Sequence, residues 1–200
     1  MCPRASAQHR GGGVRTGLKR QAGVALALWL PLLVIAASAV PEPSGYWMGA
    51  THGPVATTLK GGTVIHTRNL AALLKAGSAM VVDVSDAPRR PAHMAADAVW
   101  LPVPHPVIPG ASWIPGAGLG AISPAVEKLF RERLRLGTHN DPAHALVIYC
   151  HKSCWLSWNA AKRAISYGYT SVYWFPDGME GWRAAGLPTE PAPAQVAPER

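Results

Sequence analysis

The stretch that decides the fold is residues 145–163, ALVIYCHKSCWLSWNAAKR, in which an apolar run is followed by two cysteines and an alanine-containing segment. A continuous apolar run such as 145–149 is typical of a strand that is buried on both faces of a parallel sheet. Residues 155–167 favour a helix, and Gly168 supplies its end. The sequence therefore predicts a strand, a short loop with Cys150 and Cys154, and a helix.

The segments on either side repeat this alternation of strand and helix. A β-like run at 63–66 precedes a helix with Thr67 as its expected N-cap and Gly77 as its end. Further elements are expected at 80–84 (strand), 86–109 (proline-rich loop), 112–115 (strand), 123–136 (helix from Ser123, ended by Gly137), 171–175 (strand) and 180–185 (helix). Such alternation predicts an α/β fold: a single domain with a small parallel sheet flanked by helices. Ligands of such sheets bind beyond the carboxyl ends of the strands, which is where Cys150 lies.

The first 39 residues have the pattern of a secretory signal peptide. Basic residues (Arg10, Arg15, Lys19, Arg20) precede an apolar run at 22–37, and Ala37-Ser38-Ala39 forms a small-x-small cleavage signal. The alternative is an uncleaved N-terminal anchor. No later stretch is long and apolar enough to span a bilayer, so we expect a periplasmic protein with no membrane segment after cleavage.

Composition and charge exclude some classes of function. The chain is 48% hydrophobic and 15% charged, which is too apolar for a disordered protein. Five basic residues and no acidic ones lie in the leader, so the net charge falls from +8 to +3 when the leader is removed. That excess is small and is not clustered, so a nucleic-acid partner is not expected.

The cysteines indicate where the chemistry lies. Cys2 is lost with the leader, which leaves Cys150 and Cys154 in an oxidising compartment. A disulfide between them would close a very short loop and stabilise the fold little, so the pair is better explained by redox chemistry or by a ligand. The following helix start, Lys152 and a protonated His151 favour a thiolate at Cys150. We therefore predict that Cys150 is the nucleophile and Cys154 the resolving thiol.

Other uses of the two sulfurs stay open. As soft ligands, Cys150 and Cys154 suit copper(I), with His151 or another histidine, in a binding module without catalysis. A c-type haem needs a histidine after the second cysteine, where Trp155 stands. Zinc would lack a full tetrahedral ligand set, so no metal is predicted with certainty.

The other conspicuous residues have mainly structural interpretations. Core packing is expected for Trp100, Trp113, Trp174 and Trp182. Trp155 and Trp158 suit either packing or the lining of a crevice for a redox cofactor. Asp83, at the end of a strand, is expected to hold a turn beside that crevice.

Beyond these patterns, residues 145–188 resemble the C-terminal half of a rhodanese-like domain, with strand, cysteine loop, paired alanines, Gly turn, Trp182 and a final Ala-Gly-Leu-Pro. Residues 81–84 (VVDV), 108–111 (IPGA) and 114–115 (IP) look like earlier signatures of that family, so the resemblance covers 63–188. It implies a loop whose N–H groups surround a persulfide or an oxyanion at Cys150. The cradle would be formed by His151, Lys152, Ser153 and Trp155.

The chain also departs from that pattern. No arginine closes the loop, the loop is one residue longer, and Cys154 lies inside it. A persulfide on Cys150 would then be open to attack by Cys154, which would release sulfide and leave a disulfide.

The Cys-x-x-x-Cys-Trp element resembles a narrower group, the exported proteins associated with pyrroloquinoline quinone (PQQ)-dependent alcohol catabolism in bacteria. That resemblance implies an accessory protein whose partner is a PQQ-dependent dehydrogenase or its transport system. The expected organisation is a signal peptide at 1–39, an extended arm at 40–62 packed through Tyr46 and Trp47, the domain at 63–188, and a flexible tail at 189–200.

Overall fold

A computed structural model describes residues 40–77, 79–88, 91, 93–95, 99 and 103–195. The expected leader, Trp100 and the last five residues lie outside the described part. Within that part, no helix has the length and apolar character needed to cross a membrane.

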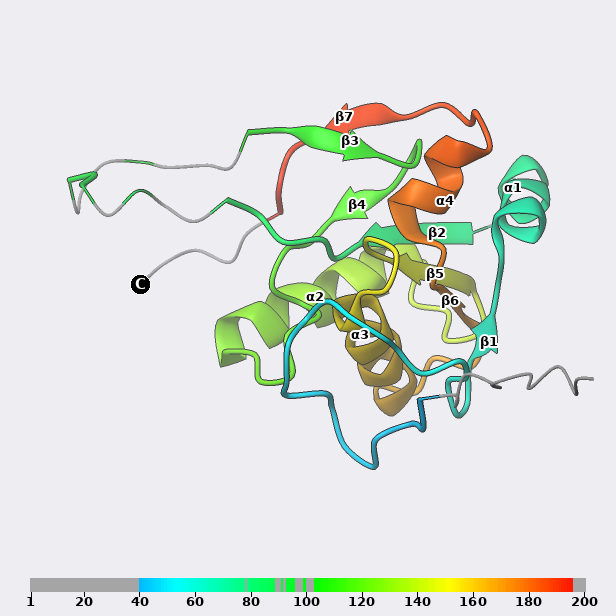
Figure 1. The fold of residues 1–200 in the computed structure, drawn as a ribbon, viewed down its shortest axis with the longest axis horizontal. Helices are drawn as coiled ribbons and strands as arrows, with labels where there is room; N and C mark the ends of the chain where they lie inside the picture. Colours follow the sequence, from blue (N-terminus) through cyan, green and yellow to red (C-terminus); the bar gives the residue numbers. More distant parts are fainter. Residues whose placement is uncertain are drawn as a thin grey trace, which may run out of the picture. The chain divides into compact units, whose positions relative to one another are not determined.

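The centre of the fold is a five-stranded, entirely parallel sheet (Figure 1). Its order is β1-β6-β5-β2-β4, and β2 and β5 pair over five residues each, ending at Asp83 opposite Tyr149. The strands are β1 (Thr63–Val64), β2 (Ala79–Asp83), β4 (Ser112–Trp113), β5 (Ala145–Tyr149) and β6 (Val172–Phe175). The α/β class predicted from the sequence is confirmed.

Helices cover both faces of the sheet. They are α1 (Thr67–Lys75), α2 (Pro124–Gly137), α3 (Trp155–Ser166) and α4 (Gly178–Ala184). Buried side chains of α2 and α3 pack with Val82 and Ile148, whereas those of α1 and α4 pack with Val81 and Val147. Neighbouring strand residues thus point to opposite faces, as the period of two requires, and this is why 145–149 is apolar throughout.

The start of α1 differs from the prediction. Thr67 is the first helical residue rather than the N-cap, and His66 takes the cap position without a side-chain cap bond. The reason is a distant carboxylate: Asp177 accepts hydrogen bonds from the N–H and the hydroxyl of Thr67, at 3.0 Å each. The predicted cap of α2 is confirmed, since Ser123 Oγ accepts from the N–H of Val126.

The sequence did not predict a small antiparallel pair of strands. It joins β3 (His105–Val107), from the predicted proline-rich loop, to β7 (Glu190–Ala192), from the segment predicted to be a flexible tail. Pro106 and Pro191 lie opposite each other in this pair. The pair forms although neither proline has a backbone N–H to donate. Burial of Val107 fixes it to the domain, an interaction that local sequence patterns do not show.

The arm at 40–62 packs along α3 through Tyr46 and Trp47, as predicted. Trp47 stacks on Trp155 with ring centroids 4.4 Å apart, and its backbone exchanges two hydrogen bonds with the side chain of Asn159. Tyr46 covers the guanidinium of Arg163 at 4.2 Å. These contacts bring the next residues of the arm to the cysteine loop.

Candidate functional site

The two cysteines meet at the carboxyl edge of the sheet. Cys150 directly follows β5, and Cys154 is the N-cap of α3. Between them the chain curls back, and Ser153 adopts a left-handed conformation with φ of 56°. Both cysteines are free and buried, with exposed fractions of 0% and 2%. The loop therefore brings together the pair that the sequence predicted.

The two sulfurs have different electrostatic surroundings. The Cys154 side chain and burial raise the pKa of Cys150. The Cys150 side chain lowers the pKa of Cys154, and the N–H of Leu156 adds to the effect. The physical reason is that α3 begins at Cys154, so the first free amides and the positive end of the helix serve that sulfur. These surroundings favour a thiolate at Cys154, whereas the sequence favoured one at Cys150.

Backbone amides that were predicted to surround the Cys150 sulfur donate to other acceptors instead. The N–H of His151 bonds to the Cys150 sulfur, but the N–H of Lys152 donates to Glu180 and that of Trp155 to the carbonyl of Thr51. Ser153 contributes its carbonyl, which accepts from Gly53. The loop thus binds to its own neighbours, where the resemblance implied a ring of amides around one anion.

Residues 51–53 of the arm, which we call the strap, lie across the loop. His52 forms an antiparallel bridge with Cys154, with the hydrogen bonds Trp155 N to Thr51 O (2.8 Å) and Gly53 N to Ser153 O (3.0 Å) on either side. A pocket of about 190 Å³ lies beside the strap, lined by Trp47, Met48, Thr51, Leu119, Trp155 and Asn159, among others. The thiols are therefore covered by the arm, with a small cavity next to them.

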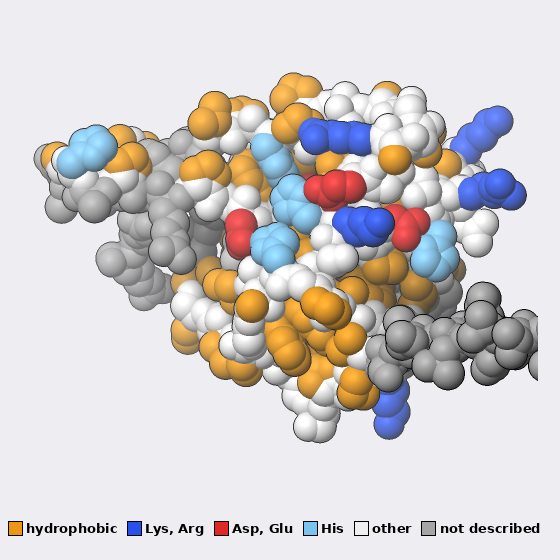
Figure 2. Space-filling view, viewed as in Figure 1, with side chains coloured by type: hydrophobic (Ala, Val, Ile, Leu, Met, Phe, Trp, Pro, Cys, Tyr) orange, Lys and Arg blue, Asp and Glu red, His pale blue; other side chains and the backbone are white. Residues whose placement is uncertain are grey.

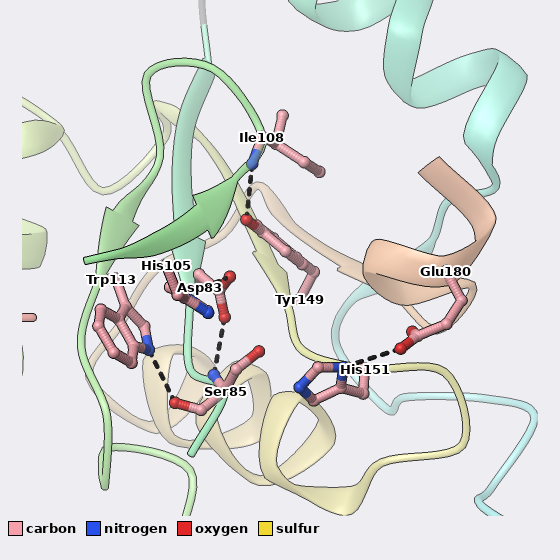
Figure 3. Close-up of polar contacts among 8 residues, drawn as sticks. All are labelled: Asp83, Ser85, His105, Ile108, Trp113, Tyr149, His151 and Glu180. Atoms are coloured by element: carbon pink, nitrogen blue, oxygen red, sulfur yellow. Dashed lines mark hydrogen bonds and ion pairs between the residues drawn. The ribbon is translucent and has the colours of Figure 1, made fainter. Parts of the chain in front are cut away.

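The start of α4 holds the other side of the loop (Figure 3). Met179 donates its N–H to the carbonyl of Cys150 at 3.0 Å, and Glu180 accepts from His151 Nδ1 at 2.8 Å. Gly178 makes this approach close: its φ is 61°, and a Cβ there would lie 2.4 Å from the His151 carbonyl carbon. The sequence predicted only a turn at this glycine.

Asp83 holds a turn, as predicted, and does more. It is fully buried, and Oδ1 accepts from the N–H of Ser85 at 2.7 Å. Oδ2 lies 3.4 Å from Nε2 of His105, which is ion-pair range without a hydrogen bond. Burial and the charge of Asp83 raise the pKa of Tyr149, whose hydroxyl also accepts from the N–H of Ile108. Asp83 further raises the pKa of Cys150.

The sequence did not predict a role for His105. Its ring centroid lies 3.8 Å from that of Trp113, a contact that depends on the β3–β7 pair and that the neighbouring sequence does not indicate. Of the tryptophans, Trp113, Trp174 and Trp182 are buried as expected. Trp158 is fully buried and donates to the carbonyl of Thr58, so it packs the arm onto α3.

Charged and histidine side chains gather in the middle of the face shown in Figure 2, where α4 and the cysteine loop lie in Figure 1. The rings of His52 and His151 are 6.1 Å apart on this face. Among the described residues, however, no three histidine, cysteine or acidic side chains come together as a metal site. A metal bound at the cysteine loop would have the sulfurs of Cys150 and Cys154 as ligands.

The chain is similar to known proteins in two comparisons, one with family models and one with solved structures. The family model of the rhodanese-like domain matches residues 67–185. Solved structures that resemble the chain include the polysulfide-sulfur transferase homodimer from Wolinella succinogenes, at 19% identity over 68% of this chain and 81% of that one, with a TM-score of 0.42. A thiosulfate sulfurtransferase from Pseudomonas aeruginosa is 19% identical over 70% and 22% of the two chains, with a TM-score of 0.43. A human single-domain sulfurtransferase is 21% identical over 60% and 95%, with a TM-score of 0.40. The search of curated proteins found no match.

Proposed function

Because the chain belongs to the rhodanese-like domain family, we propose that its buried cysteine pair accepts a sulfane sulfur from a small donor and releases it as sulfide. The observation that carries this proposal is the loop itself, which places two free, buried cysteines at the carboxyl edge of the sheet, with Cys154 at the start of α3. A pair in that state has a nucleophile and a resolving group ready in one loop.

The first step uses the charged sulfur. The Cys154 thiolate attacks the outer sulfur of a thiosulfate or polysulfide. The bond between that sulfur and the rest of the donor breaks, and the rest leaves with the electron pair. The product is a persulfide on Cys154. Since both thiols are buried, the donor must be small.

The second step uses the neighbouring thiol. The Cys150 sulfur attacks the inner sulfur of the persulfide, the bond to the outer sulfur breaks, and the outer sulfur leaves with the electron pair and the Cys150 proton as hydrosulfide. The two cysteines lose two electrons and become a disulfide, while the sulfane sulfur gains them. An external thiol reductant restores the pair.

Intact-protein mass spectrometry tests both steps. We expect the reduced chain, mixed with thiosulfate or polysulfide, to gain one sulfur atom briefly and then to lose two hydrogens as sulfide appears. Cys150→Ser should stop at the persulfide, and Cys154→Ser should prevent the disulfide. If neither a persulfide nor a disulfide forms with either donor, the proposal is wrong.

We further propose an accessory role in the periplasm, for a PQQ-dependent dehydrogenase or its transport system. The leader pattern at 1–39 and the Cys-x-x-x-Cys-Trp element support it. Sequencing of the N-terminus of the exported protein should find Val40 first. Co-purification from cells grown on alcohol should recover the dehydrogenase or a transporter component; recovery of neither would argue against the role.

Copper(I) binding is the second candidate, favoured by two free cysteines in one short loop. Anaerobic titration of the reduced chain with copper(I) should then show one ion bound, and Cys154→Ser should lose it. Equal binding by parent and variant would remove this candidate.

A further inference from the structure

The first residues of α4 make a continuous set of contacts with the cysteine loop. Each of the loop residues Cys150, His151 and Lys152 has its own partner there: the Cys150 carbonyl accepts from Met179, His151 Nδ1 donates to Glu180 Oε1, and the Lys152 N–H donates to Glu180 Oε2 at 2.7 Å. A carboxylate only accepts hydrogen bonds, so Nδ1 of His151 must carry a proton. Glu180 therefore fixes both the place and the tautomer of His151.

A second carboxylate, on the N-cap residue of α4, provides an internal comparison. Asp177 bonds to His66 Nδ1 at 2.9 Å and to the N–H of Thr67 at 3.0 Å. This repeats the Glu180 arrangement, one histidine and one backbone N–H, but on α1 and away from the thiols. Of these two carboxylates, only Glu180 reaches the cysteine loop.

We propose that Glu180 is a positioning residue which, by holding the His151 ring and the Lys152 N–H, fixes the cysteine loop against α4 and so keeps Cys154, at the start of α3, as the sulfur that reacts first. This inference rests on the proposed function and deepens it. The carboxylate accepts two hydrogen bonds from the loop and so holds the His151 ring and the Lys152 backbone in place.

The charged groups around the two sulfurs also bear on which cysteine reacts first. The charge of His151 lowers the pKa of Cys154. Asp86, which follows β2, opposes the effect by raising the pKa of Cys154, and Asp83 raises that of Cys150. Among the described residues, His52 on the strap, whose ring centroid lies 6.1 Å from that of His151, and Lys152 on the loop itself add positive charge when protonated.

The test is the pH profile of alkylation by iodoacetamide, with each cysteine quantified by mass spectrometry and the thiolate followed by its ultraviolet absorbance. In the reduced parent chain, Cys154 should be modified first. Glu180→Gln keeps the shape and removes the charge, and it should lower the rate at Cys154 about threefold or more near neutral pH. Glu180→Asp should recover part of the rate. His151→Gln should resemble Glu180→Gln, and the double variant should lose little more.

Asp177→Asn is the matched control, because it removes the same kind of carboxylate from the same helix. It should leave the alkylation profile unchanged. Equal losses of the alkylation rate at Cys154 in Asp177→Asn and Glu180→Gln would mean that α4 acts only by general stabilisation. Modification of Cys150 before Cys154 in the parent chain would also overturn the proposal. The function itself fails separately: if sulfur donors give no persulfide or disulfide while Glu180→Gln still shifts the profile, the positioning role stands and the proposed reaction does not.

Discussion

Gly178 is the residue with the least freedom to vary in the site. A Cβ at this position would lie 2.4–2.6 Å from backbone atoms of Cys150, His151 and Lys152, and its φ is in the left-handed region. We expect Gly178→Ala to lower the free energy of unfolding by about 3 kcal/mol or more, because steric overlap adds to backbone strain. Gly186→Ala is the control, since Gly186 has φ of 68° but nothing near its Cβ, and it should cost about 1 kcal/mol. Urea unfolding of both variants would measure the difference; equal losses would show that α4 moves away without penalty.

Asp83 makes a second prediction at the scale of one residue. Its charge raises the pKa of Cys150, so Asp83→Asn should lower that pKa, while the amide oxygen still accepts from Ser85. The pH at which Cys150 becomes alkylated should fall. Asp86→Asn is the contrasting variant, because Asp86 raises the pKa of Cys154 and its removal should act there. A shift at the same cysteine in both variants would contradict this division of charge.

At the scale of elements, α4 makes the domain sensitive to acid. Burial opposes ionisation of Glu180 and Asp177, yet hydrogen bonds to the loop and to α1 lower the pKa of both carboxyls. A carboxyl with a lowered pKa in the folded state stabilises the fold above its unfolded pKa, and this stabilisation disappears as the pH falls through the folded value. We therefore expect stability to decline below the normal carboxyl range of about pH 4. Glu180→Gln and Asp177→Asn should each flatten the decline in urea unfolding measured against pH; an unchanged slope in the double variant would refute it.

The elements also show what the sequence was able to predict. Apolar runs with clear ends predicted β2, β5 and β6, and cap and stop residues predicted α2 and α3 to within one or two residues. The pairing of β3 with β7 was missed because it joins segments more than 80 residues apart, each of which contains a proline. The cysteine pair was predicted from its spacing. Spacing alone could not predict which sulfur is favoured as thiolate, because that depends on where α3 begins and on how the amides of the loop are shared.

At the scale of the whole molecule, the arm decides whether a reagent reaches the thiols. Tyr46 and Trp47 anchor the arm on α3, and the strap then covers Cys154 through the bridge at His52. A domain with only a bare cysteine loop would leave that edge of the sheet open. In this chain, access to the sulfurs therefore depends on two hydrogen bonds of the strap. One runs from the N–H of Gly53 to the carbonyl of Ser153, and the other from the N–H of Trp155 to the carbonyl of Thr51.

Gly53→Pro tests this coupling. Proline removes the N–H that bonds to Ser153, and its φ near −65° is incompatible with the 136° of Gly53, so the strap should detach. Alkylation of Cys154 should become about tenfold faster, as expected for loss of one or two hydrogen bonds, and bulky reagents should gain more than iodoacetamide. Gly45→Pro is the matched control in the same arm, where a Cβ meets nothing and φ is not left-handed, and it should leave the rate unchanged. If Gly53→Pro reacts no faster than the parent chain, reagents reach the pair by another route and the arm only stabilises the fold.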